Sequence, residues 1–131
     1  SDIPVFLPTP PEVLAGSTRL GAGTAQKIAL NIMSTYMGIL LGHVMDGQMV
    51  NLIANNAKLF KRSEKIVINI TGCNANKAKN ALREAKGGVK LAILLASGAK
   101  SITTAQNILA SEKQNLRLAI KRVKFEKLGS K

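Results

Sequence analysis

A broad apolar stripe between Thr24 and Leu41 places the strongest constraint on what this chain can fold into. Apolar residues recur there at steps of three and four, which is the spacing of one helix face. The pattern predicts a long helix that starts at Thr24, or as early as Ser17, and ends at a Gly42 cap. So wide a stripe leaves apolar surface that needs a partner, and we therefore expect the chain to form oligomers. The stripe consists of Ala25, Ile28, Ala29, Ile32, Met33, Tyr36, Met37, Leu40 and Leu41.

Further helical patterns fill most of the remaining chain. The apolar run Ile66–Ile70 could also form a strand, but its length and its phase with Leu59 favour a helix. Ser111 and Gln114 form a capping-box pattern, which leaves open whether the last stretch is one helix or two. Asn74 is suited to cap the helix that follows it. The sequence thus predicts a mainly helical chain, with helices at residues 49–70, 75–85, 89–97 and 102–125 and a frayed basic tail.

The N-terminal residues Asp2–Leu7 read as one short buried strand that ends at the proline-rich segment 8–11. A single strand is not stable by itself. It therefore either frays or belongs to a sheet that this chain does not supply.

Residue counts limit the possible classes of site. Aromatic residues make up 3% of the chain, so the core must be aliphatic. Cys73 is the single cysteine, which excludes an internal disulfide and a cysteine zinc site and fits a reducing cytoplasm. His43 is the single histidine, and without a second ligand we expect no metal site. No apolar run approaches the roughly 20 residues that span a bilayer, so we expect no membrane segment.

The formal charge of +12 is concentrated in the second part of the chain. Residues 1–54 contain two basic and three acidic residues, whereas residues 55–131 contain seventeen basic and four acidic ones. A basic half suggests a polyanionic partner. However, the lysines are spread through helical patterns, and aromatic residues for base stacking are almost absent. A solvated lysine-rich surface is therefore the preferred interpretation, and nucleic acid is not expected as a partner.

The segment Pro11–Lys27 has the composition of an anion-binding turn. Its small-residue turn, residues 16–18, leads directly into the predicted helix, whose first N–H groups lack intrahelical partners. Arg19 and Lys27 would add positive charge, and Glu12 could contact sugar hydroxyls. The alternative from the residues alone is an ordinary loop capped by Ser17 or Thr24.

The order of residues in this segment carries a family resemblance. PEVLAGSTRL followed by AGTAQK resembles the signature of the N-acetylmuramic acid 6-phosphate etherases, which the glucokinase regulatory protein shares. Gly21 departs from the pattern, since the family usually has lysine there. Further along, MVNLIANNAKL loosely follows the family form LMVDVQATNAKL, with Asn51 in place of aspartate. Catalysis by Asn56 or Lys58 is possible, but helix-surface packing is the preferred interpretation.

The resemblance implies the architecture of a C-terminal fragment. Residues 1–54 would be the end of an α/β sugar isomerase (SIS) domain, whose last strand corresponds to residues 2–7. Residues 55–131 would be a small helical C-terminal domain. Within it, residues 63–98 resemble a ubiquitin-associated (UBA) three-helix unit. Members of the family are typically dimers with shared sites, so the resemblance also implies a homodimer.

The resemblance also implies a function. The family cleaves the D-lactyl ether of N-acetylmuramic acid 6-phosphate, a phosphorylated amino sugar, into N-acetylglucosamine 6-phosphate and D-lactate, without a metal or cofactor. Its catalytic glutamates lie upstream of the signature, so we expect no catalytic residue in this chain beyond a supporting role for Glu12, and no activity of the chain alone. The implied substrate-binding residues are Glu12, Ser17, Thr18, Arg19 and Lys27.

Two alternatives from other functional classes stay open on the sequence. The first is a non-enzymatic phosphosugar-binding regulator, because the glucokinase regulatory protein shares the signature. The second is a basic helical nucleic-acid-binding module.

Overall fold

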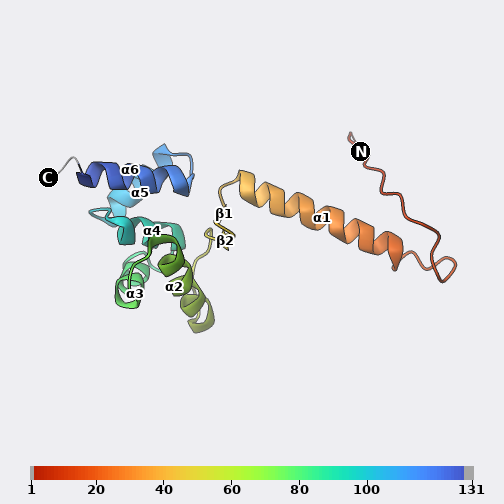
Figure 1. Cartoon of the computed structure of the whole chain (residues 1–131), viewed down its shortest axis with the longest axis horizontal. Helices are drawn as coiled ribbons and strands as arrows, with labels where there is room; N and C mark the ends of the chain where they lie inside the picture. The colour runs from red at the N-terminus through yellow and green to blue at the C-terminus, as the bar shows by residue number, and fades with distance from the viewer. Residues whose placement is uncertain (1, 129–131) are drawn as a thin grey trace. The chain divides into compact units, whose positions relative to one another are not determined.

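The computed structural model describes residues 2–128, and the chain divides into two compact units between Gly38 and Ile39 (Figure 1). The described chain is mainly helical, as the sequence predicts. None of its helices is long and apolar enough to cross a membrane. The elements are α1 Gly21–Leu40, β1 Val44–Met45, β2 Gln48–Met49, α2 Ala57–Thr71, α3 Ala75–Glu84, α4 Val89–Ser97, α5 Ile102–Ser111 and α6 Leu116–Leu128.

The first unit consists of an irregular segment followed by most of α1. The strand predicted at residues 2–7 does not form, since the described residues offer no neighbouring strand to pair with it. No residue of α1 is buried. Its apolar stripe remains open to solvent, with exposed fractions from 53% to 68% for Ile28, Ile32, Met33, Tyr36, Met37 and Leu40.

The second unit begins with the end of α1 and a tight hairpin. Gly42 ends the helix as predicted, with a left-handed φ of 67° and its N–H donating to Ile39 O at 3.0 Å. Strands β1 and β2 pair antiparallel through a two-residue turn, Asp46–Gly47, whose φ angles are 48° and 70°. Two positive φ angles give the turn that matches the twist of a hairpin.

The helix predicted from Met49 starts eight residues later, at Ala57. The intervening residues instead pair with the α3–α4 turn: Ala54 N–H donates to Gly87 O at 2.9 Å, and Val89 N–H donates to Leu52 O at 3.0 Å. The helix predicted for residues 49–56 is therefore wrong. These residues lie in an extended segment that pairs with the turn between α3 and α4.

Helices α2, α3 and α4 pack against one another. Asn56 and Asn74 cap α2 and α3, each accepting a backbone N–H at 2.9 Å through its side-chain oxygen. The cap at Asn74 confirms the prediction, and the cap at Asn56 gives that residue a structural role. Gly72 ends α2 in the left-handed region, which separates it from α3.

The last two helices contact α4 and each other. Residues 102–125, which the sequence left open as one helix or two, belong to two helices. Asn115 caps α6, its Oδ1 accepting Leu118 N–H at 3.2 Å. Lys113 and Gln114 adopt left-handed φ angles of 49° and 66° in the turn. Helix α6 continues to Leu128, and the rest of the predicted frayed tail, residues 129–131, lies outside the described residues.

The core of the second unit is aliphatic, as the scarcity of aromatic residues requires. Its fully buried side chains come from α2 to α6 and from Val50, which precedes α2. Two polar residues share this core: Ser63, whose hydroxyl has no hydrogen-bond partner among the described residues, and Lys90.

Candidate functional site

The Glu12 carboxylate occupies the N-terminus of α1. Its Oε2 accepts Gly21 N–H at 2.8 Å, and its Oε1 accepts Ala22 N–H at 3.0 Å. These two backbone hydrogen bonds lower the pKa of Glu12, because they stabilise the carboxylate over the neutral acid. A negative charge at this position also interacts favourably with the helix dipole.

The remaining N–H groups of the first turn of α1 also have partners inside the chain. Gly23 N–H donates to Thr18 O at 2.8 Å, and Thr24 N–H donates to Leu20 O at 3.0 Å. At the helix start where the sequence predicts an anion-binding turn, the structure places the protein's own carboxylate. Neither Ser17 nor Thr24 caps the helix through its side chain.

The loop that Glu12 closes carries three of the predicted substrate-binding residues. A turn at Gly16, with φ of 80° and a hydrogen bond from Ser17 N to Leu14 O, leads into Thr18 and Arg19. Thr18 and Arg19 are exposed, whereas Ser17 is half-buried. Arg19 forms no ion pair among the described residues, so its guanidinium is available to an anionic ligand.

Lys27 is also exposed, and it lies on α1 one to two turns beyond the helix start. It forms no ion pair within residues 2–128. Of the predicted site residues, the structure thus gathers Glu12, Ser17, Thr18 and Arg19 on one loop and adds Lys27 on the helix that this loop precedes.

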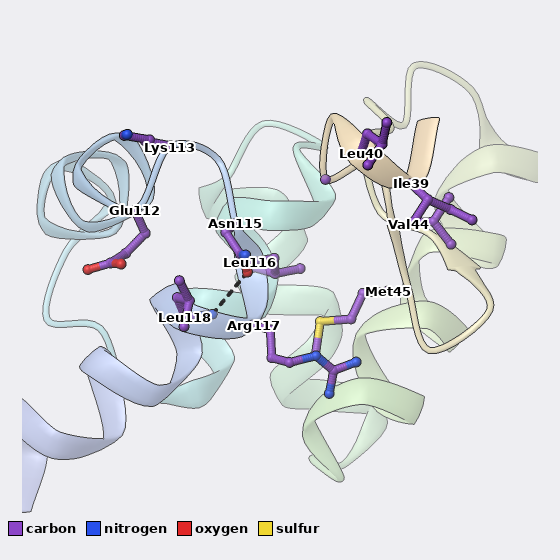
Figure 2. Close-up of a pocket in the computed structure, with 11 residues that line it drawn as sticks. Ile39, Leu40, Val44, Met45, Glu112, Lys113, Asn115, Leu116, Arg117 and Leu118 are labelled. Atoms are coloured by element: carbon purple, nitrogen blue, oxygen red, sulfur yellow. Dashed lines mark hydrogen bonds between the residues drawn. The ribbon is translucent and has the colours of Figure 1, made fainter. Parts of the chain in front are cut away.

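A pocket of about 480 Å³ lies in the second unit, away from these residues in the sequence (Figure 2). It is lined by the end of α1, by β1, and by the turn from α5 into α6. Its Arg117 pairs with Asp46 at 2.6 Å, and its Glu112 pairs with Arg122 at 3.2 Å. Glu112 is the only carboxylate in its lining, so the pocket holds no pair of carboxylates for acid–base work.

The described part of the chain contains no group of side chains suited to bind a metal ion. No three histidine, cysteine, aspartate or glutamate side chains gather there in a way that could hold an ion.

No protein-family model matches the chain. Curated proteins do match it. It is 42% identical over 120 residues to the N-acetylmuramic acid 6-phosphate etherase of Prochlorococcus marinus, covering 92% of this chain and 39% of that protein. It is 48% identical over 94 residues to the etherase of Deinococcus radiodurans, covering 72% of this chain and 31% of that protein.

The chain belongs to the N-acetylmuramic acid 6-phosphate etherase family. A third relative, N-acetylmuramic acid 6-phosphate etherase 2 of Bacillus licheniformis, is 40% identical over 92% of this chain and 40% of that protein. The chain therefore spans between about a third and two fifths of the length of these etherases.

The etherase match extends well beyond the segment that suggested it. With 92% of the chain aligned, the second unit belongs to the matched region together with the loop at Pro11–Lys27. The resemblance drawn from the loop is thereby confirmed.

One feature of the etherase-like loop was missed by sequence reasoning. Glu12 was interpreted as a residue facing the sugar, whereas its carboxylate contacts the backbone of Gly21 and Ala22. An acid nine residues ahead of a glycine-rich helix start is the signal that could have suggested a cap. A Cβ at Gly21 would lie 3.3 Å from Glu12 Oε2, so glycine eases this close approach.

Proposed function

We propose that the protein to which this chain belongs is an etherase, a carbon–oxygen lyase acting on N-acetylmuramic acid 6-phosphate. The products would be N-acetylglucosamine 6-phosphate and D-lactate, in the recycling of cell-wall amino sugars. The observation that carries this proposal is 42% identity over 92% of the chain to a protein named as that etherase. The relatives described above are all named etherases, which supports this function over a regulator or a nucleic-acid-binding module.

The chain corresponds, in this proposal, to the C-terminal part of such an enzyme. Elimination of lactate needs one group to remove a proton next to the masked aldehyde and another to protonate the departing oxygen. Glu12 is poorly suited to donate a proton near neutral pH, because its pKa is lowered. Asp46, Glu112 and Glu126 are engaged with arginines. The resemblance places the catalytic glutamates upstream of the signature, so in this proposal they come from another part of the enzyme and the chain alone is inactive.

The loop at residues 12–19 would form one wall of the phosphosugar site. Arg19 supplies an exposed cation, and the hydroxyls of Ser17 and Thr18 can hydrogen-bond to phosphate or sugar oxygens. Lys27 adds a second positive charge on α1. Glu12 would act as a positioning residue, because its hydrogen bonds fix the loop against the helix start.

The surrounding architecture follows from the same proposal. Residues up to 54 would complete an SIS domain, and residues 55–131 would form a separate C-terminal domain with a UBA-like unit, α2 to α4. The exposed apolar stripe of α1 would be covered in a homodimer, located in the cytoplasm.

The test is an assay of D-lactate release from N-acetylmuramic acid 6-phosphate. We expect no turnover by this chain and turnover by the full-length enzyme that contains it. Robust release by the chain alone would contradict the assignment of the catalytic carboxylates elsewhere. Absence of release by the full-length enzyme would contradict the etherase function itself.

A further inference from the structure

Lys90 is a buried cation in an unfavourable place. It is the second residue of α4, and only 7% of it is exposed, between the fully buried Val89 and Ala92. The N-terminal end of a helix is the positive end of its dipole, and the first turn of α4 contains no acidic residue. Both burial and the dipole therefore oppose a positive charge here, and burial lowers the pKa of Lys90.

The partners of Lys90 within the described residues do not compensate this charge. Its Nζ donates to the backbone oxygen of Gln114 at 3.3 Å, which is a long bond to a neutral acceptor. No carboxylate lies within 4.0 Å of it in residues 2–128. An ammonium group has three donors, so Lys90 retains hydrogen-bonding capacity for an anionic acceptor.

Lys90 lines a pocket of about 290 Å³ on the second unit. Most of the wall is apolar and includes Leu91 and Leu109, and Asn51 and Gln114 add polar groups. The wall is held by backbone hydrogen bonds, among them Val89 N–H to Leu52 O at 3.0 Å. A cation at an apolar wall, with amide groups beside it, is the arrangement expected for a small organic anion.

We propose that this pocket binds a small monocarboxylate, with Lys90 as its counter-ion. One carboxylate balances one ammonium charge and accepts the hydrogen bonds that Gln114 does not take, while a short alkyl group contacts Leu91 and Leu109. A phosphate fits less well, because near neutral pH it carries more negative charge than one ammonium balances and offers no apolar surface to the walls. The site is derived from residues 50–114 alone and does not depend on the proposed etherase activity.

Acetate is the probe for a first experiment on the chain itself. We expect sodium acetate, added at constant ionic strength in exchange for sodium chloride, to shift the NMR signals of Lys90 Nζ and of the Leu91 and Leu109 methyl groups along a saturable curve. D-lactate should compete, and inorganic phosphate should not. Equal shifts with phosphate would overturn the monocarboxylate assignment, and absence of a saturable shift with acetate would overturn the site.

Variants separate the site from general charge effects. Lys90→Met keeps an apolar chain of similar length and should weaken acetate binding at least about tenfold. Lys86→Met removes an exposed charge nearby in sequence and should leave acetate binding unchanged. Unchanged binding in Lys90→Met would contradict the proposal.

A second variant keeps the proposal testable if Lys90→Met does not fold. Asn51→Asp places a carboxylate on the pocket wall, where it should act as an internal counter-ion. We expect a higher melting temperature and loss of the acetate-dependent shifts. An Asn51→Asp protein that binds acetate as the wild type does would show that Lys90 does not face the pocket as an anion partner.

Discussion

Gly87 lies so close to Ala54 that a Cβ at position 87 would be 2.6 Å from the Ala54 carbonyl oxygen. The same two residues share a hydrogen bond, from Ala54 N–H to Gly87 O at 2.9 Å. This contact fixes the extended segment ahead of α2 against the turn between α3 and α4. Gly87 itself has a left-handed φ of 83°.

Replacement of Gly87 by alanine is predicted to destabilise the second unit by more than about 2 kcal/mol, since it adds a clash to the cost of a left-handed alanine. Gly72→Ala is the matched control. Its φ is 69°, but nothing lies within 4 Å of the added Cβ. We expect that control to lose about 1 kcal/mol. Urea denaturation measures both, and equal losses would show that the contact with Ala54 contributes nothing.

The hydrogen bonds of Glu12 predict a pH dependence at the start of α1. The pKa of Glu12 is lower in the folded chain than its ordinary value of 4.5. The Glu12 carboxylate therefore stabilises the folded state fully above pH 4.5, and this stabilisation is lost as the pH falls through the lowered pKa. The Gly21 and Ala22 amide signals should therefore shift together in an acid titration followed by NMR. In Glu12→Gln this transition should be absent. A transition that persists in the variant would assign it to another group.

Ser63→Ala is predicted to stabilise the chain by about 0.5–1 kcal/mol. The Ser63 hydroxyl is buried without a hydrogen-bond partner among the described residues, and alanine removes it while favouring the helix. Ser111→Ala serves as the comparison, because the Ser111 hydroxyl donates to Ile108 O and accepts from Arg122. Thermal unfolding should rank Ser63→Ala above the wild type and Ser111→Ala at or below it. A destabilised Ser63→Ala protein would mean that the hydroxyl is satisfied in solution.

The helix caps give a prediction for two asparagines. Asn56→Ala and Asn74→Ala should each cost about 1 kcal/mol, because each leaves a first-turn N–H without its side-chain acceptor. Asn80→Ala, on the exposed surface of α3, should be close to neutral. Chemical denaturation of the three variants checks this ranking, and a neutral Asn56→Ala would reopen a functional role for that residue.

Arg19 is predicted to bind the phosphate of the substrate in the full-length enzyme. Arg19→Ala should raise the KM for N-acetylmuramic acid 6-phosphate at least about tenfold, because a charged hydrogen bond to phosphate is lost. Lys65→Ala removes an exposed charge outside the loop and should leave KM unchanged. Steady-state D-lactate release measures both. A change in kcat alone would indicate that Arg19 acts in the chemical step and not in binding.

Local signals in the sequence predicted most of the helices. The caps at Asn74 and Gly42 act within one turn of chain, so a sequence window contains all the information they need. The predicted start of the second helix was wrong because residues 52–54 pair with Gly87–Val89, more than thirty positions away. The strand at residues 2–7 was predicted from composition, but a strand exists only with a neighbour.

The candidate site was predicted in outline and not in its chemistry. The order of residues from Pro11 to Lys27 identified the loop, and the structure places Ser17, Thr18 and Arg19 on it. Composition could not reveal that Glu12 closes this loop, because that role depends on a turn that returns the carboxylate to Gly21. The burial of Lys90 was equally invisible, since a lysine in an apolar helix pattern usually extends its ammonium to solvent.

The absence of buried residues along α1 has a consequence for hydrogen exchange. A helix of 20 residues without tertiary packing is only marginally stable in water, so its amides should exchange through local opening. Those of α4, whose Ile93 and Leu94 are fully buried, should exchange only when the whole second unit unfolds. Deuterium uptake would thus be fast for the amides of α1 and slow for those of α4. A partner that covers α1 would be detected first as protection of its amides.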